Sequence, residues 1–187
     1  MERRDCLKRF TEMGVCAGAL SLLGLDGGRL PGATTPADEL AALKGQKEFL
    51  QSWLSDLLAT MDKVLDRETI AKLMEGCGRG CYDRHTFKQE IAAKGKGDLD
   101  KLIAAYDRNF EIWKEGRAVH IRYGETSPGC YCPAASYRPA KPNDAHCECT
   151  RATHQAIFET ALGRAFRVDI LESVRRGGKT CHFVVHV

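Results

Sequence analysis

Residues 150–187, TRATHQAIFETALGRAFRVDILESVRRGGKTCHFVVHV, decide the C-terminal half of the fold. A helix is expected from about 150 to 162, because Gly163 follows as a C-cap and the apolar residues before it recur at helical spacing. Two strand-like runs then flank the Gly-Gly pair at 177–178, which predicts a closing β-hairpin. Alternation in the last run places Cys181 on the core side.

Upstream of this helix, residues 129–150 read GCYCPAASYRPAKPNDAHCECT and contain two Cys-x-Cys pairs. Both sulfurs of such a pair can reach one metal centre, whereas a disulfide between such near neighbours would be strained. A disulfide between a cysteine of the first pair and a cysteine of the second stays open as an alternative. The pattern therefore indicates a metal or a metal cluster held by Cys130, Cys132, Cys147 and Cys149.

The second pair, Cys147 and Cys149, falls at the N-terminus of the expected helix. The helix dipole and the free N–H groups at such an end favour thiolate over thiol. His146 and His154 could add nitrogen ligands, although a single histidine is more often structural or exposed. These features predict sulfur-dominated metal ligation at this end of the helix.

A short strand is expected immediately before the first Cys-x-Cys pair. Residues 118–123, AVHIRY, alternate in the manner of a half-buried strand. We interpret His120 within it as a hydrogen-bonded or solvent-facing residue and not as a ligand. Pro133 stops the chain from continuing as helix or sheet, so the first pair should lie in a loop at the end of this strand.

The first half of the chain predicts helices. From about 37 to 65 the apolar residues recur at three- and four-residue spacing, which predicts one long amphipathic helix. Asp66 is the expected N-cap of a helix from 67 to about 75, and Asp98 that of another helix reaching about Glu115. The predicted buried face of the long helix carries Phe49, Trp53, Leu57, Met61 and Val64.

The segment 76–81, GCGRGC, interrupts the expected helix pattern. Three glycines would cost a helix interior about 1 kcal/mol each, which predicts a helix end or tight loop with a close backbone approach. Cys77 and Cys81 could bind one metal, close a disulfide or be buried free thiols. Taken together, the elements predict an α+β fold in which a helical N-terminal half packs on a small antiparallel sheet with a C-terminal helix and β-hairpin.

Composition places the chain among ordinary soluble globular proteins. It has 187 residues, 43% of them apolar and 28% charged, with a formal net charge of +3. Charges of both signs are interspersed, which is a weak footprint for nucleic acid, and we expect no nucleic-acid partner. Nine cysteines are many for this length.

The N-terminus, MERRDCLKRFTEMGVCAGALSLLGLDGG, pairs Arg3 and Arg4 with a moderately apolar run that is too short for a membrane span. It resembles a twin-arginine export signal. We therefore expect residues 1–36 to be a signal segment, 37–187 to be the mature Cys-rich domain, and the protein to be periplasmic or exported without a membrane span. Removal of the signal leaves seven cysteines, an odd number that disulfides alone cannot use.

The C-terminal stretch, HCECTRATHQAIFETALGRAFRVDILESVRRGGKTCHFVV, resembles the end of the 4-vinyl reductase domain and the related thiazoline-carboxylate hydrolase-like proteins. The resemblance implies a structural zinc held by cysteines and a glutamate beside a cavity for a small or apolar ligand. Carried over by position, it implies Cys149, Glu172 and Cys181 as ligands. The fourth ligand position of that family falls on Arg175, so another cysteine would have to substitute.

These observations lead to one main expectation and two alternatives. The main one is an exported metal-thiolate protein, with an iron-sulfur cluster or zinc, that serves redox chemistry or small-ligand binding. The alternatives are a cysteine- or metal-dependent hydrolase and a disulfide-stabilised periplasmic binding module. The expected partners are a small-molecule ligand or redox partner and, in a homodimer, a second copy. The candidate ligands of the cofactor are Cys77, Cys81, Cys130, Cys132, Cys147, Cys149, Cys181 and Glu172.

Overall fold

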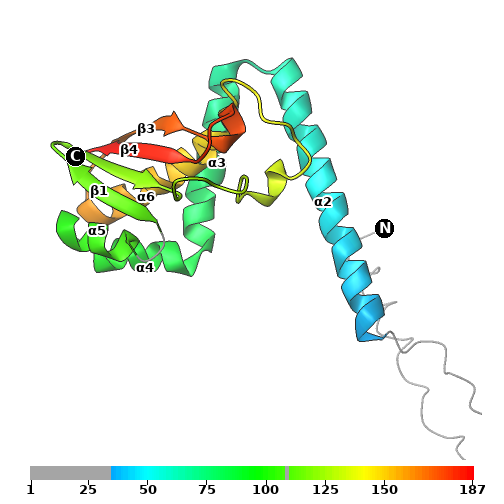
Figure 1. Ribbon diagram of the computed structural model, residues 1–187, viewed down its shortest axis with the longest axis horizontal. Helices are drawn as coiled ribbons and strands as arrows, with labels where there is room; N and C mark the ends of the chain where they lie inside the picture. Colours follow the sequence, from blue (N-terminus) through cyan, green and yellow to red (C-terminus); the bar gives the residue numbers. More distant parts are fainter. Residues whose placement is uncertain (1–34, 108–109) are drawn as a thin grey trace, which may run out of the picture. The chain divides into compact units, whose positions relative to one another are not determined.

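A computed structural model describes residues 35–107 and 110–187 (Figure 1). The predicted signal segment lies almost wholly outside these residues. The chain divides into two compact units, Met1–Leu40 and Ala41–Val187. The described part of the first unit is the start of helix α2, where Thr35 and Asp38 exchange hydrogen bonds as a cap. Among the described helices, none is long and apolar enough to cross a membrane.

The second unit confirms the predicted α+β class. Its sheet has four antiparallel strands in the order β1-β2-β4-β3. The sheet is formed by β1 (Glu111–Glu115), β2 (Ala118–Arg122), β3 (Arg167–Glu172) and β4 (His182–His186). The helices are α2 (Pro36–Val64), α3 (Arg67–Arg84), α4 (Thr86–Lys94), α5 (Leu99–Tyr106) and α6 (Glu148–Leu162), with short 3-10 turns η1 (Pro133–Ala135), η2 (Ala145–Cys147) and η3 (Val174–Arg176).

The main core lies where α4, α5 and α6 meet one face of the sheet. Phe158 of α6, Ile121 of β2 and Phe183 of β4 are almost completely buried there, together with Tyr106 of α5. Gly163 ends α6 in the left-handed conformation, as its sequence position predicted. The C-terminal hairpin forms as expected, with Glu172 opposite His182. The core therefore fixes α6 and the two ends of the hairpin relative to β2.

The segment after α5 is a strand and not the predicted continuation of the helix. The helix ends at Tyr106, and residues 111–115 pair with β2 through a tight turn in which Gly116 has φ +57. Trp113 consequently lies on the sheet, stacked on His120 at 4.9 Å. His120 also bonds to His182 at 3.0 Å, as the hydrogen-bonded interpretation of this residue expected. Pairing with β2 outweighed a local helical pattern.

The predicted helix break at 76–81 is also wrong, because α3 continues to Arg84. The predicted close approach is present: a Cβ on Gly78 would lie 2.1 Å from the carbonyl oxygen of Cys149. The Gly78 carbonyl in turn accepts a hydrogen bond from Thr153 at 3.0 Å. Close packing of α3 on α6 therefore compensates for the helical cost of glycine at this position.

The predicted buried face of α2 is the third correction. Leu58 and Ser55 of α2 are buried, and Met61 packs beside them in a small second core with Ile70. Most of the large apolar residues of α2 are exposed instead, namely Phe49, Leu50, Trp53, Leu57 and Val64. Helical periodicity was correct, but the chain itself supplies no surface to cover this stripe within the described residues.

Candidate functional site: a thiol-lined pocket

One pocket collects most of the cysteines that the sequence singled out. It has a volume of about 1000 Å³ and is lined by residues from α3, α4, α6, the end of β2 and the loop that follows β2. Its wall is mainly apolar and aromatic, with Phe87, Phe110 and Ile157 among the lining residues. The five thiols that line it are Cys81, Cys130, Cys132, Cys149 and Cys181.

These five thiols come from four separately positioned segments. Cys81 lies near the end of α3, and Cys149 lies in the first turn of α6, which packs against α3. Cys130 and Cys132 occupy the loop after β2, and Cys181 directly precedes β4. The fold thus brings together four segments that are far apart in sequence.

The other two candidate cysteines lie elsewhere. Cys77 is exposed on α3, one turn before Cys81, and does not line the pocket. Cys147 is buried, and its sulfur lies 2.7 Å from the Ser173 hydroxyl. All seven cysteines of the described residues are free thiols. The second Cys-x-Cys pair is therefore split, with one sulfur in the pocket and one directed to the β3–η3 junction.

The predicted thiolate character of the helix N-terminus is not what the structure gives. Burial, with a smaller contribution from the neighbouring thiols of Cys132, Cys81 and Cys77, raises the pKa of Cys149 to about 12. Burial likewise raises the pKa of Cys147 to about 11, against the opposing hydrogen bond from Ser173. Desolvation outweighs the helix dipole, so both groups are protonated thiols at neutral pH in the protein alone.

A cation stands at the edge of the thiol cluster. The ammonium of Lys88 on α4 lies 2.9 Å from the Cys81 sulfur and donates a hydrogen bond to it. Both residues line the pocket. This contact places the ammonium end of Lys88 directly against a sulfur of the pocket.

The floor of the pocket contains a buried histidine between two tyrosines. His154 Nδ1 lies 3.1 Å from the Tyr106 hydroxyl, and Nε2 lies 3.0 Å from the Tyr123 hydroxyl. Burial, with a smaller effect of Lys88, lowers the pKa of His154 to about 3, so the ring is neutral. Desolvation also raises the pKa values of both tyrosines, which keeps the hydroxyls protonated.

The burial of Tyr106 fixes the direction of this chain of hydrogen bonds. Its hydroxyl is bonded to His154 among the described residues, so it donates to Nδ1; the opposite direction would leave a buried O–H without an acceptor. His154 then carries its proton on Nε2 and donates to Tyr123. The hydroxyl hydrogen of Tyr123, a pocket-lining residue, is left to point at a further acceptor.

The position that the resemblance assigns to a glutamate ligand is used differently here. The Glu172 carboxylate accepts hydrogen bonds from the backbone N–H groups of Lys179 at 2.6 Å and Thr180 at 3.4 Å. It therefore holds the turn that leads to Cys181, and it is not among the pocket-lining residues.

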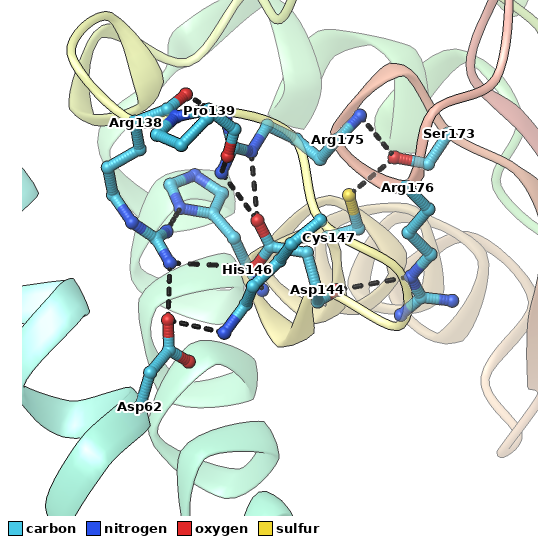
Figure 2. A network of polar contacts seen from close by, with 10 residues as sticks. Asp62, Arg138, Pro139, Asp144, His146, Cys147, Ser173, Arg175 and Arg176 are labelled. Atoms are coloured by element: carbon cyan, nitrogen blue, oxygen red, sulfur yellow. Dashed lines mark hydrogen bonds and ion pairs between the residues drawn. The ribbon is translucent and has the colours of Figure 1, made fainter.

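Arg175, which occupies the fourth ligand position of that family, anchors a polar network (Figure 2). Its buried guanidinium bonds to the Asp144 carboxylate at 2.5 and 3.0 Å and to the carbonyl oxygens of Arg138 and Pro139. Arg138 in turn pairs with Asp62 of α2 at 2.6 Å. The network fastens the loop between the two Cys-x-Cys pairs to η3 and to α2.

The network is fully paired. Burial acts to raise the pKa of Asp144, but bonds from the His146 N–H and from Arg175 outweigh it and hold that pKa below its usual value. No buried side-chain nitrogen or oxygen in the described parts of the chain lacks a hydrogen-bond partner. Asp144, Arg138 and Lys88 were not predicted from the sequence; the available signal for the first two was the presence of charged residues inside a Cys-rich loop.

The donor set fits a thiophilic metal, although the side chains do not form a closed site. Within residues 35–107 and 110–187, no three or more His, Cys, Asp or Glu side chains converge as metal ligands. Five thiols nevertheless share one wall, and sulfur ligands are those that zinc, copper(I) and iron-sulfur clusters select. Two of the five lie in the loop after β2, so ligation would require that loop to bring its sulfurs toward Cys149.

The chain matches a known protein family over most of its length. A family model described as "Family of unknown function (DUF6144)" matches residues 39–186, and the chain belongs to this family. Comparison with the curated proteins yields no match.

Among solved structures, the chain is similar to a trafficking protein particle complex subunit 3 from Naegleria fowleri, a structure described as covalently bound to palmitic acid. The TM-score is 0.50 at 13% sequence identity, and the match covers 76% of this chain and 95% of that chain. At this identity the likeness concerns the fold alone.

Proposed function

We propose that this protein is an exported metal-thiolate protein whose pocket thiols hold an iron-sulfur cluster or zinc for redox chemistry or small-ligand binding. The observation that carries the proposal is that five of the seven described cysteines line one cavity. Core packing does not require cysteines from four segments to line the same cavity, because buried free cysteines pack equally well when they are far from one another. Export by the twin-arginine route is part of the proposal and rests on Arg3, Arg4 and the apolar run behind them.

The surroundings of the thiols favour an anionic centre. A tetrahedral zinc or a cubane cluster takes about four thiolates, and the wall offers five. The Lys88 ammonium and the Tyr123 hydroxyl lie on the same pocket and would offset or hydrogen-bond negative sulfur. When bound, a cluster would supply one-electron transfer, whereas zinc would supply a structural or Lewis-acid centre.

Binding of an apolar ligand in the same pocket is a second candidate, favoured by the size and aromatic lining of the cavity. A volume of about 1000 Å³ lies at the upper end of the range for small-molecule sites. The structural neighbour solved with palmitic acid makes a fatty-acyl chain a reasonable probe. In this function the Tyr123 hydroxyl would donate to the polar end of the ligand.

Anaerobic purification of the full chain, followed by metal and acid-labile sulfide analysis with an absorption spectrum, tests the proposal. A brown protein with iron and sulfide in equal amounts supports the cluster, and a colourless protein with zinc supports the zinc site. Metal-free protein after anaerobic reconstitution with iron, sulfide and zinc overturns the metal-thiolate function. Displacement of a fluorescent fatty acid by palmitate, measured on the same preparation, then tests the second candidate separately.

A further inference from the structure

An exposed apolar stripe runs along α2, away from the pocket. Seven exposed residues follow one another along this helix at alternating spacings of three and four, at positions 43, 46, 50, 53, 57, 60 and 64. Five of them are large and apolar: Leu43 is 62% exposed, Leu50 56%, Trp53 53%, Leu57 41% and Val64 69%. This is the heptad repeat of a coiled-coil seam, sustained for three heptads, with Gln46 and Thr60 as its polar members.

Within residues 35–107 and 110–187, packing contacts support only part of α2. Every residue from 41 to 50 is exposed, whereas Ser55 and Leu58, on another face of the helix, are buried, and Leu58 belongs to the second core. Helical segments of this length are marginal in water without a packed face, and Gly45 adds a further cost. Since no described residue covers the exposed half of α2, this half needs a further partner surface to be a stable helix.

We propose that this stripe pairs with the α2 stripe of a second copy, so that the protein is a homodimer through a helix-helix seam. The charges of the helix favour a protein partner over a membrane surface: three lysines and three acidic residues between 41 and 64 cancel, which removes electrostatic attraction to anionic lipid. The heptad spacing fits another helix with the same spacing.

The available area meets the need of a dimer. Phe49 adds a sixth large apolar side chain beside the seam, 69% exposed. Six such side chains at about half exposure present on the order of 600 Å² per copy, so a pair would bury on the order of 1,200 Å², the lower end of the range for specific interfaces. A two-fold axis places the same patch on both sides, as isologous dimers require. This pairing does not depend on the pocket or on its metal.

Sedimentation equilibrium of the full chain between about 1 and 100 μM tests the dimer. We expect the dimer mass for the parent and the monomer mass for Leu50→Glu/Leu57→Glu. Ser52→Glu, an exposed position of the same helix outside the seam, is the matched control and should remain dimeric. A parent that is monomeric at 100 μM overturns the proposal, and so does a Leu50→Glu/Leu57→Glu variant that stays dimeric.

Two further measurements keep the result unambiguous. In a Trp113→Phe background, the emission of Trp53 should shift to longer wavelength on dilution as the dimer separates; an emission independent of concentration contradicts the seam. The second measurement is co-sedimentation with phosphatidylglycerol vesicles. If the parent is monomeric and co-sediments with the vesicles, and if Leu50→Glu/Leu57→Glu abolishes this binding, the stripe is a membrane-binding surface and the homodimer is overturned.

Discussion

The two sides of the loop between the Cys-x-Cys pairs differ in how their polar atoms are partnered. On one side, Asp144 and Arg175 bond to each other and to backbone carbonyls within the protein. On the other side, Cys149 and Cys181 face a large cavity, and the Tyr123 hydroxyl retains a proton to donate into it. The paired network therefore serves stability, whereas the pocket has hydrogen-bond donors that the described residues do not use.

Replacement of Arg175 by Met should give the largest loss of stability. The change removes the ion pair that Arg175 makes with the buried Asp144 carboxylate, and breaking a buried pair in this way costs about 3–5 kcal/mol. Arg175→Lys should recover part of the loss, because it keeps the charge but not the two-pronged geometry. Urea unfolding measures both; a loss below about 1 kcal/mol for Arg175→Met would mean that the network does not fasten the loop.

Acid should weaken the fold through His154. Its pKa is about 3 in the folded protein and about 6.5 when unfolded, so the unfolded chain binds more protons between these values. Stability is therefore complete above about pH 6.5 and falls as the pH decreases, by about 3 kcal/mol at pH 4 from this residue.

The variant His154→Gln isolates that contribution. It keeps hydrogen-bonding capacity but does not titrate, so the difference in unfolding free energy between pH 7 and pH 4 should be smaller than in the parent by about 3 kcal/mol. Equal pH dependence in the two proteins would show that the ring is not held neutral between Tyr106 and Tyr123.

Substitutions at two glycines of α3 distinguish the effect of packing against α6 from the effect of helix propensity. Gly78→Ala should destabilise the protein by about 2 kcal/mol, because its Cβ would meet Cys149 O at 2.1 Å and overpacking has costs of this size. A Cβ on Gly76 would meet nothing within 4 Å, so Gly76→Ala should stabilise the protein by about 0.5–1 kcal/mol through its higher helix propensity. Thermal unfolding compares them, and a stabilising Gly78→Ala would contradict the close contact of α3 and α6.

A small difference between two variants should report the hydrogen-bond direction at the pocket floor. Tyr106→Phe removes the donor to a buried histidine nitrogen and should cost about 1–3 kcal/mol, whereas Tyr123→Phe removes one acceptor beside the cavity and should cost about 1 kcal/mol. Urea unfolding of both variants gives the order. The reverse order would mean that the proton of His154 is on Nδ1.

The sequence predicted the elements with strong local signals and missed those set by distant partners. The C-terminal helix, its Gly163 cap and the hairpin follow from local spacing, and the structure confirms them. The strand at 111–115 and the unbroken α3 depend on β2 and α6, which no local pattern reveals. The exposure of Trp53 was missed for the same reason, since periodicity indicates a stripe but not what covers it.

The candidate site shows the same division. Residue type alone identified the seven cysteines, and the structure brings five of them to one pocket while placing Cys77 and Cys147 outside it. Spacing could not separate Cys147 from Cys149, because a helix start directs neighbouring side chains to different surroundings. Lys88 could not be predicted as a partner of Cys81, since the contact depends on how α4 follows α3.

Metal bound per folded chain in Cys149→Ser and Cys147→Ser, after anaerobic reconstitution, tests the central claim most directly. The two positions are two residues apart; Cys149 is half-buried and lines the pocket, whereas Cys147 is buried and does not line it. We predict that Cys149→Ser loses most of the bound metal while Cys147→Ser keeps the content of the parent. Equal contents in all three proteins, or a loss confined to Cys147→Ser, would contradict a metal held by the pocket thiols.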